Sequence, residues 1–407
     1  MFRRCFLLSL LVSHAGVVSA QALPQAAAQK TERPYVVLVS MDGFRFDYAQ
    51  RYQAKNILDL ARIGASAEAL IPSFPSVTFP NHISLVTGKY PGNHGIVAND
   101  FYDPARNASY SLSKTATDGS WYRAKPIWIA AEEQGVKAAA MFWPTSDAEI
   151  AGRRPSYWSL YDEKTPDEER VNKVLEWLRL PAELRPHLIT LYFSDADDAG
   201  HHNGPEAEAT RTAVTKLDRH IGELWRGLQA SGLPVNLILV SDHGMQAVQG
   251  VVNLSDFADL SRARVINAGT FSLLYTPDAA VRESIYRALH NRDRRFQVYR
   301  TNHTPRRWHY QSDPRMGDLI VVARQAIEFS VSPRAAPVDQ GRHGYDPGKF
   351  SNMRGVFYAA GPNILPGARV KPFVNVNVYA FIARVLGLTV PPDLDGDGKM
   401  LERIRRK

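Results

Sequence analysis

The 407 residues of this chain are enough for one large α/β domain with a substantial core. Hydrophobic residues make up 44% of the sequence and charged residues 22%, which excludes disordered and collagen-like proteins. The formal net charge of +8 favours anionic substrates or reflects only a solvated surface, and no nucleic-acid-binding motif accompanies the scattered basic residues.

The N-terminus has the pattern of a secretory signal. Arg3 and Arg4 precede an apolar run at residues 6–12, and small residues that offer a cleavage point follow. We therefore predict a signal peptide at residues 1–20 and a flexible leader, rich in Ala and Gln, at residues 21–33.

Export agrees with the rest of the chain. No later stretch approaches the roughly 20 apolar residues of a membrane-spanning helix. Cys5 is the one cysteine and lies in the predicted signal, so the mature chain has neither a thiol nor a disulfide. We expect a secreted or periplasmic protein, and the absence of cysteine fits a Gram-negative bacterial periplasm best.

From residue 34 onward, segments typical of strands and helices alternate. Short apolar runs predict buried strands, and apolar residues three or four apart predict helices. Strands are predicted at residues 36–41, 136–143, 188–193, 237–241 and 355–360, and helices at residues 57–63, 125–134, 168–180, 206–230 and 375–386. This alternation predicts an α/β fold with a predominantly parallel central sheet and helices on both faces.

One region interrupts the alternation. Residues 261–331 contain short apolar runs, a basic aromatic segment and many turn residues, and we predict a small inserted subdomain there. No internal repeat or long linker divides the remainder. Residues 34–407 are therefore expected to form one domain that carries this insertion.

Acidic and histidine residues follow three of the predicted strands. Asp42 follows the first strand, Asp197 and His201 follow the strand at residues 188–193, and Asp242 and His243 follow the next. A single aspartate at such a place is more often a helix N-cap or a turn former than part of a functional site. Because ligands of open α/β sheets bind beyond the carboxyl ends of the strands, the three clusters together predict one shared site.

A further histidine, His343, lies in a Gly-flanked loop suited to presenting a side chain at close range. Carboxylate and imidazole donors without thiolate suit zinc, manganese or iron. Three aspartates and three histidines exceed what one tetrahedral ion takes from a protein. They predict two ions about 4 Å apart, as used in in-line displacement at phosphorus. Four other histidines are expected to be structural or at the surface: His82, His94, His187 and His220.

Thr78 is the candidate nucleophile. It lies in a proline-rich turn just before a helix start predicted at residues 81–86. The N–H groups and positive dipole of a helix N-terminus favour a phosphoryl group, and coordination to a metal is one way to ionise a hydroxyl. The alternative is an ordinary N-cap threonine.

Motifs spread from about residue 35 to residue 390 resemble one known family. They are SMDGFR at residues 40–45, FPSVTFPNH at 74–82, LVTGKYPGNHGI at 85–96, FWP at 142–144, DDAGH at 197–201, SDHGM at 241–245, HGYD at 343–346 and FSNM at 350–353. By these motifs the chain resembles the nucleotide pyrophosphatase/phosphodiesterase family of the alkaline phosphatase superfamily. The resemblance implies an alkaline-phosphatase-like fold.

The resemblance also implies two zinc ions. One would be bound by Asp197, His201 and His343, and the other by Asp42, Asp242, His243 and the Thr78 oxygen. It implies that Thr78 attacks phosphorus and forms a covalent intermediate that water hydrolyses. Asn99 would donate a hydrogen bond to a non-bridging phosphate oxygen, which stabilises developing charge.

The same resemblance implies a nucleobase slot. The residues that line or shape this slot are expected to be Phe79, Leu112, Trp143, Asp147, Tyr161 and Tyr192. Aromatic faces bind any base by stacking. For Trp143 and Tyr192, packing in the core is the alternative.

The chain also departs from animal members of that family. It has no Cys-rich N-terminal domain and no nuclease-like C-terminal domain, so it resembles a single-domain bacterial form. Residues 393–399 resemble the start of a calcium loop, but Ile404 occupies the twelfth position where such loops carry glutamate, and a plain acidic turn is preferred.

The expected function is hydrolysis of nucleoside triphosphates and nucleotide phosphodiesters to nucleoside monophosphates through a phosphothreonine intermediate. A lipid or choline phosphodiesterase, or a phosphomonoesterase of the same superfamily, is the alternative. A non-catalytic nucleotide-binding protein is disfavoured, because a binding module has no need of a nucleophile such as Thr78.

Overall fold

The computed structural model describes residues 1–2, 33–311, 313–331 and 339–406. Arg33–Lys407 form one compact unit. The predicted signal peptide and leader fall almost wholly on residues 3–32, outside the described residues. Within the described ranges no helix is both long enough and apolar enough to cross a membrane.

An eight-stranded sheet forms the centre of this unit. In spatial order its strands are β19 (Ala368–Val370), β2 (Ala65–Ala67), β18 (Phe357–Ala360), β9 (Val235–Val240), β1 (Tyr35–Met41), β8 (Leu188–Phe193), β6 (Ala138–Met141) and β7 (Tyr157–Trp158). Only β18 runs antiparallel to its neighbours, β2 and β9, among these described strands. The predicted, mostly parallel α/β sheet is confirmed.

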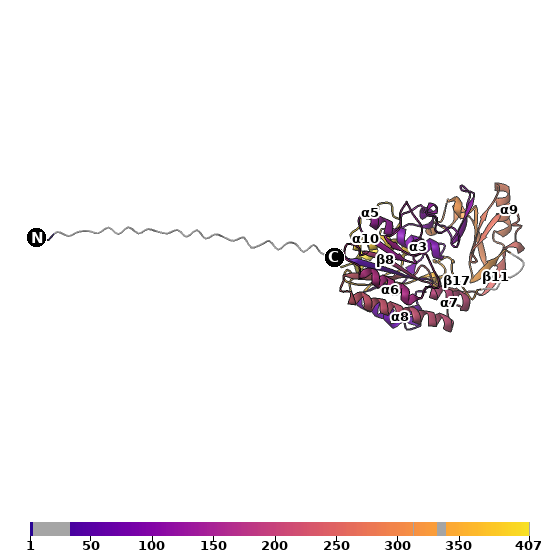
Figure 1. Ribbon diagram of the computed structural model, residues 1–407. Helices are drawn as coiled ribbons and strands as arrows, with labels where there is room; N and C mark the ends of the chain where they lie inside the picture. Colours follow the sequence, from indigo (N-terminus) through magenta and orange to yellow (C-terminus); the bar gives the residue numbers. More distant parts are fainter. Residues whose placement is uncertain (3–32, 312, 332–338, 407) are drawn as a thin grey trace. The chain divides into compact units, whose positions relative to one another are not determined.

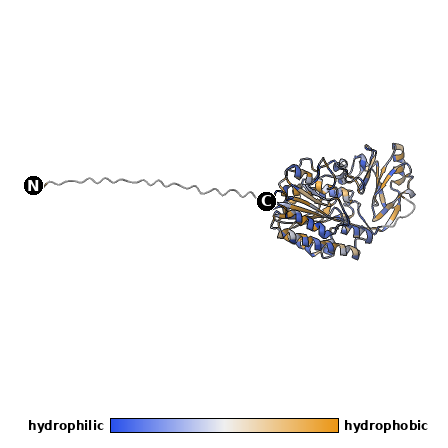
Figure 2. Ribbon diagram, in the orientation of Figure 1, coloured by the Kyte–Doolittle hydropathy of each residue, from blue (hydrophilic) through white to orange (hydrophobic). Residues whose placement is uncertain are grey.

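The burial of β1 explains why these residues form a central strand. All seven of its residues are buried, as expected for a strand covered on both faces. Val37, Val39 and Met41 contribute to the core on one face, and Val36 and Leu38 to the core on the other. Figure 2 shows the apolar strands between helices whose outer surfaces are hydrophilic. Each such side chain contributes roughly 1.5–3 kcal/mol by leaving water.

Helices cover both faces of the sheet, as predicted. The helices on one face are α2 (Lys55–Ile63), α6 (Asp167–Leu178) and α8 (Glu208–Ala230), and those on the other are α3 (Thr78–Thr87), α5 (Ile127–Glu133) and α10 (Val378–Val385). Figure 1 shows α6 and α8 below the sheet and α5 and α10 above it. Further helices are α1 (Tyr48–Arg51), α4 (Pro91–His94) and α7 (Asp195–Asn203).

The region predicted as an insertion contains a sheet of its own. Four antiparallel strands follow the spatial order β12 (Arg264–Asn267), β13 (Phe271–Tyr275), β15 (Leu319–Ala323) and β14 (Phe296–Arg300). Helix α9 (Ala279–Leu289) packs on it through Ile285 and Leu289. A short parallel pair, β11 (Gly250–Asn253) with β16 (Ile327–Ser330), extends the same core.

Short ladders complete the fold around the sheets. The remaining pairs are β3 (Leu70–Ile71) with β20 (Phe373–Val374), β4 (Asp100–Asp103) with β5 (Ala108–Ser111), and β10 (Gln246–Ala247) with β17 (Gly341–Arg342). The last of these pairs brings the loop of His343 next to the loop that follows β9. Figure 1 places β17 beside α7, between the central sheet and the lobe that contains α9.

Two elements differ from prediction near the functional edge. Residues 195–203, for which no helix was predicted, form helix α7. Helix α3 begins at Thr78, three residues earlier than the predicted start, with Val77 as its N-cap. Thr78 is therefore the first helical residue, and the alternative that it serves as the N-cap is wrong.

Candidate metal centre and active site

Four parallel strands bring the predicted acidic residues to one edge of the sheet. β1 is paired in parallel with β8 and β9, and β8 with β6, so their carboxyl ends lie together. Asp42 directly follows β1, Asp242 follows β9 by two residues, and Asp197 lies in the first turn of α7 after β8. The shared site expected from the sequence is thereby assembled on the sheet.

A glycine permits the closest approach at this edge. Gly43 has φ +65°, and a Cβ there would lie 2.7 Å from the Asp197 Cα. Its N–H donates to Asp242 Oδ1 over 3.3 Å. No larger residue fits between the loop after β1 and helix α7, so Gly43 lets the three carboxylates converge.

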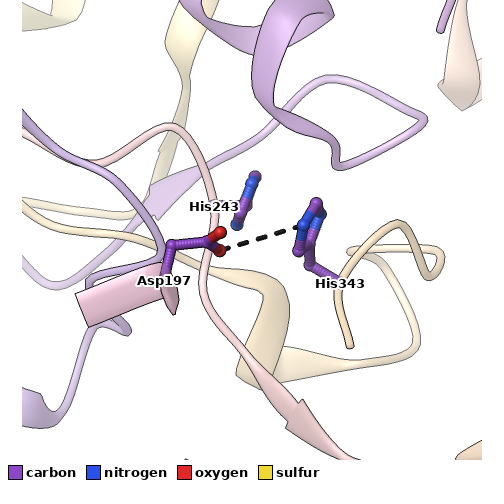
Figure 3. Close-up of side chains that lie close together, drawn as sticks. All are labelled: Asp197, His243 and His343. Atoms are coloured by element: carbon purple, nitrogen blue, oxygen red, sulfur yellow. Dashed lines mark ion pairs between the residues drawn. The ribbon is translucent and has the colours of Figure 1, made fainter. Parts of the chain in front are cut away.

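One group of candidate ligands consists of Asp197, His243 and His343, whose donor atoms all lie within 4.8 Å of one another. Figure 3 shows these three side chains pointing toward a common space. Asp197 Oδ1 is 3.8 Å from His343 Nε2, and Asp197 Oδ2 is 3.5 Å from His201 Nε2. The spacing of four between Asp197 and His201 is one turn of α7, which puts both on the same helix face.

The other carboxylates gather around His243. Its Nε2 lies 3.5 Å from Asp42 Oδ1 and 3.0 Å from Asp242 Oδ2. Thr78 Oγ1 is 3.4 Å from the same nitrogen. His243 therefore lies between two groups of donors, and its ring stacks on His343 with centroids 3.7 Å apart.

The three predicted histidine ligands share one arrangement. In each ring Nδ1 lies at hydrogen-bond distance from a backbone carbonyl: His201 with Gly341 at 2.9 Å, His243 with Gly244 at 3.0 Å, and His343 with Ser76 at 3.0 Å. A ring that donates its Nδ1–H to a carbonyl has the Nε2 lone pair free for a metal. Each Nε2 faces the aspartates, so all three rings are oriented as ligands.

Unpaired carboxylate oxygens complete the case for cations. Asp42 Oδ1, Asp197 Oδ1 and Asp242 Oδ2 are buried without a hydrogen-bond partner among the described residues. Burial raises the pKa of Asp42 well above its usual range, and the charges of Asp242 and Asp197 raise it further. Bound cations would keep these carboxylates ionised and supply the missing partners. The donor set thus fits two metal ions.

His82, predicted to be structural, also lies at this centre. It forms a close group with the carboxylates of Asp42 and Asp242. Its Nδ1 is 2.9 Å from Thr78 O, and its Nε2 is 2.8 Å from Ser40 Oγ. Because both of its ring nitrogens already have hydrogen-bond partners, His82 is placed to position the neighbouring candidate ligands and not to bind a metal itself. Its position one helical turn after Thr78 is the sequence signal that was overlooked.

Two predicted residues meet at the N-terminus of α3. Thr78 is the first residue of the helix and is partly exposed. The Phe79 N–H donates to Asn99 Oδ1 over 2.9 Å. Because the Asn99 oxygen is thereby occupied, its NH₂ group remains available as a donor beside the hydroxyl.

The six predicted slot residues line one cavity of about 570 Å³ together with Asp42, Thr78, Asn99 and Asp197. We call it the slot cavity. Leu112 and Tyr161 are exposed, and Phe79 and Asp147 are partly buried. Burial raises the pKa of Asp147 above its ordinary value. A planar group could thus lie beside aromatic rings with its phosphate near Thr78.

Trp143 and Tyr192 combine packing with a place in the slot cavity. Trp143 is 1% exposed and its Nε1 donates to His82 O over 3.4 Å. The Tyr192 hydroxyl donates to Asp42 Oδ2 over 2.7 Å. Tyr192 therefore orients one candidate ligand, a contact that the sequence analysis did not anticipate.

Other polar residues singled out in the sequence have local partners. His94 is buried and accepts the Ile96 N–H, His187 stacks on Tyr35, and His220 pairs with Glu223. In the acidic turn, Asp393 pairs with Lys89, and Asp395 accepts hydrogen bonds from the Tyr90 N–H and Asn93. These acids fasten the turn to the segment after α3, which agrees with an acidic turn.

The sequence of residues 36–346 matches the family described as type I phosphodiesterase / nucleotide pyrophosphatase. Over 399 residues the chain is 35% identical to ectonucleotide pyrophosphatase/phosphodiesterase family member 1 of Mus musculus, covering 92% of this chain and 43% of that protein. It is 33% identical over 380 residues to an uncharacterized pyrophosphatase/phosphodiesterase of Schizosaccharomyces pombe, covering 88% and 78%. The chain thus spans less than half the length of the mouse relative.

Comparison with solved structures points to the same family. Murine ectonucleotide pyrophosphatase/phosphodiesterase 5, an inactive variant in complex with AMP, superposes with a TM-score of 0.87 and 30% identity, over 92% of this chain and 100% of that one. The human counterpart gives the same TM-score and identity. The resemblance predicted from the motifs is confirmed: the chain belongs to the type I phosphodiesterase / nucleotide pyrophosphatase family of the alkaline phosphatase superfamily.

Proposed function

We propose that this protein hydrolyses nucleotide phosphodiesters and pyrophosphates to nucleoside monophosphates, with two zinc ions and Thr78 as nucleophile. The observation that carries the proposal is the position of the Thr78 hydroxyl, 3.4 Å from His243 Nε2 at the junction of the two donor groups. The complex of the murine relative with AMP supports a nucleotide as substrate.

The donor chemistry supports zinc. Asp197, His201 and His343 would hold one ion, and Asp42, Asp242, His243 and the Thr78 oxygen the other. Aspartate oxygens and neutral imidazoles without thiolate suit zinc in a hydrolytic site. When bound, two such ions would lower the pKa of the Thr78 hydroxyl and neutralise charge on the phosphoryl group.

The residues of the chain then account for the two steps of the reaction, attack on phosphorus and hydrolysis of the intermediate. Thr78 Oγ1 forms a bond to phosphorus while the bond from phosphorus to the leaving oxygen breaks. The electron pair stays on that oxygen, which takes up a proton. The Asn99 NH₂ group donates to a non-bridging oxygen as charge develops there. Water hydrolyses the phosphothreonine, which releases the monophosphate and restores the hydroxyl.

Thr78→Ala tests the nucleophile. We expect turnover of p-nitrophenyl thymidine monophosphate to fall by about a thousandfold or more, with both metals retained in elemental analysis. Thr78→Ser, which keeps a hydroxyl, is the matched control and should retain part of the activity. Near-normal turnover in Thr78→Ala would exclude the covalent mechanism.

The substrate class is tested by a comparison of three esters. We expect p-nitrophenyl thymidine monophosphate to be hydrolysed faster than p-nitrophenyl phosphate and p-nitrophenyl phosphorylcholine, because only the first presents a base to Phe79 and Tyr161. If the thymidine ester had no advantage, the nucleotide assignment would be abandoned in favour of the monoesterase or choline esterase that turned over fastest.

A further inference from the structure

A second cavity adjoins the slot cavity at Thr78. Its volume is about 470 Å³, and we call it the distal cavity. The two cavities share Thr78, Asn99, Leu112 and Asp197, but the distal cavity continues past His201 and His343 toward the four-stranded sheet. A phosphorus atom attacked by Thr78 would therefore have open space on two sides.

Geometry assigns the two spaces to two halves of a substrate. In an in-line displacement the leaving group departs on the side of phosphorus opposite the nucleophile. If the slot cavity holds the nucleotide that stays on Thr78, the leaving half needs a separate space beside the same phosphorus. The distal cavity offers such a space, because it shares Thr78 with the slot cavity and is also lined by His343 and Ile266, which the slot cavity lacks.

One wall of the distal cavity is apolar and fixed. Ile266 lines it from β12, and Ala268 lines it from the turn between β12 and β13. Asn267 holds this turn: its Nδ2 donates to Phe329 O over 2.9 Å, and its Oδ1 accepts the Gly269 N–H over 3.2 Å. A preformed apolar wall favours the ring of an organic group.

The charges of the distal cavity oppose a polyanion. Among the described residues that line it, Arg342 is the one lysine or arginine, whereas Asp100 and Glu328 are acidic besides the candidate ligand Asp197. Arg342 is already paired, with Nη2 2.6 Å from Glu328 Oε1 and Nη1 3.1 Å from Asp339 Oδ2. Glu328 Oε2 is buried without a hydrogen-bond partner in the described part of the chain. The proposed metal ions would neutralise the scissile phosphate, and no lysine or arginine among the described lining residues is left unpaired for a further phosphate.

We propose that the distal cavity is a leaving-group subsite that selects an uncharged organic group, such as a second nucleoside, over pyrophosphate. This inference rests on the proposed function and narrows its substrate to diesters. Asp100, Glu328 and Asp339 outnumber the single arginine, and their net negative charge repels a departing pyrophosphate. A nucleoside, by contrast, packs on Ile266 and Ala268 and offers its hydroxyls to the carboxylates.

The test compares two substrates that leave the same AMP on Thr78. In adenylyl-3′,5′-adenosine the bond from phosphorus to the 3′ oxygen breaks and adenosine departs, whereas ATP loses pyrophosphate. We expect a higher kcat/KM for the dinucleotide in the wild-type protein. Glu328→Gln and Asp100→Asn should each shift the ratio toward ATP by roughly fivefold to tenfold.

Glu183→Gln is the matched control. Glu183 is an exposed acid in the loop before β8, at the opposite edge of the sheet, so its neutralisation should leave the ratio unchanged. The shift in Asp100→Asn should shrink as salt is raised, since the exposed charge of Asp100 is screened, whereas the shift in Glu328→Gln should depend less on salt because Glu328 is largely buried. A merely structural disturbance would lower turnover of both substrates alike and would not depend on salt.

The outcomes distinguish a failure of the leaving-group subsite from a failure of the proposed function. If p-nitrophenyl thymidine monophosphate is not hydrolysed, the proposed function fails. If that ester is hydrolysed but ATP is preferred to the dinucleotide, or if neither acidic variant moves the ratio, the leaving-group subsite is wrong while the nucleotide function stands.

Discussion

The candidate metal-binding edge of the central sheet and the slot cavity beside it are built differently. Asp42, Asp242 and His243 are at most 1% exposed, and each follows a fully buried strand. Leu112 and Tyr161 of the slot cavity are 39% and 47% exposed and lie in connections outside the central strands. The first region is held by the core, whereas the second combines the buried Trp143 and Tyr192 with exposed residues of loops.

This difference separates chemistry from recognition. A buried ligand that is displaced leaves an unpaired charge in the core, so the metal-binding edge tolerates little change. An exposed loop residue can be replaced without loss of the fold, which lets substrate preference vary on a constant scaffold. Substitutions in the two regions should therefore differ in which property they alter.

The largest effect is expected for Asp42→Asn. The amide keeps the size of the side chain but loses the charge that faces His243. We expect loss of bound metal and a fall in kcat/KM of about a thousandfold, equivalent to the several kcal/mol that metal ions supply. Asp59→Asn, in an exposed ion pair with Arg62, is the control and should change neither metal content nor rate. Full metal occupancy in Asp42→Asn would contradict its role as a ligand.

Gly43→Ala tests the close approach of loop and helix at the metal-binding edge. Gly135→Ala is its control: Gly135 has φ +72° but nothing within 4 Å of a Cβ, whereas at Gly43 the Asp197 backbone is 2.7 Å away. Chemical denaturation should show a loss of about 1–2 kcal/mol in the control from the backbone alone. Gly43→Ala should lose about 1–3 kcal/mol more and bind metal more weakly. Equal losses of stability in the two variants would show that the loop after β1 and helix α7 move apart at little energetic cost.

The parts of this edge that the sequence predicted are those with a local signal. The apolar run before Asp42 fixes a buried strand, and the residue after such a strand must lie at the carboxyl edge. Helix α7 lacked that signal, since its nine residues include three aspartates, two histidines and a glycine. Its acidic first turn suits a helix N-terminus, but apolar periodicity is absent.

Contacts between distant segments were not predictable from local pattern. His82 meets Asp242, 160 residues later in the chain, and the His201 ring is held by Gly341 O across 140 residues. Such pairs depend on the register of whole strands, here β10 against β17, and not on spacing within one segment. The candidate ligands could therefore be named from the sequence, while the groups that orient them required the structure.

Tyr192→Phe tests whether one residue serves both the metal-binding edge and the slot cavity, because Tyr192 lines the slot cavity yet donates to Asp42. If its hydroxyl orients the ligand, metal affinity should fall by about tenfold or more, the usual effect of removing a partner of a metal ligand. Competition with a chelator measures this change. Tyr48→Phe removes a buried hydroxyl without a hydrogen-bond partner among the described residues and should bind metal normally. An unaltered metal affinity in Tyr192→Phe would assign that side chain to the slot alone.

The smallest effect is expected for Tyr161→Ala in the slot cavity. The half-exposed ring can stack on a base, and such stacking contributes about 1–3 kcal/mol per base, so we expect the lower end, roughly a fivefold to tenfold rise in KM for the thymidine ester. Hydrolysis of p-nitrophenyl phosphate and metal content should not change, since no base is present and no ligand is touched. Trp158→Ala removes another exposed aromatic ring, one that does not line the cavity, and serves as the control. Equal losses on both substrates would mean that Tyr161 braces the Phe142 and Tyr192 rings it contacts, and that recognition, like the chemistry, depends on the core.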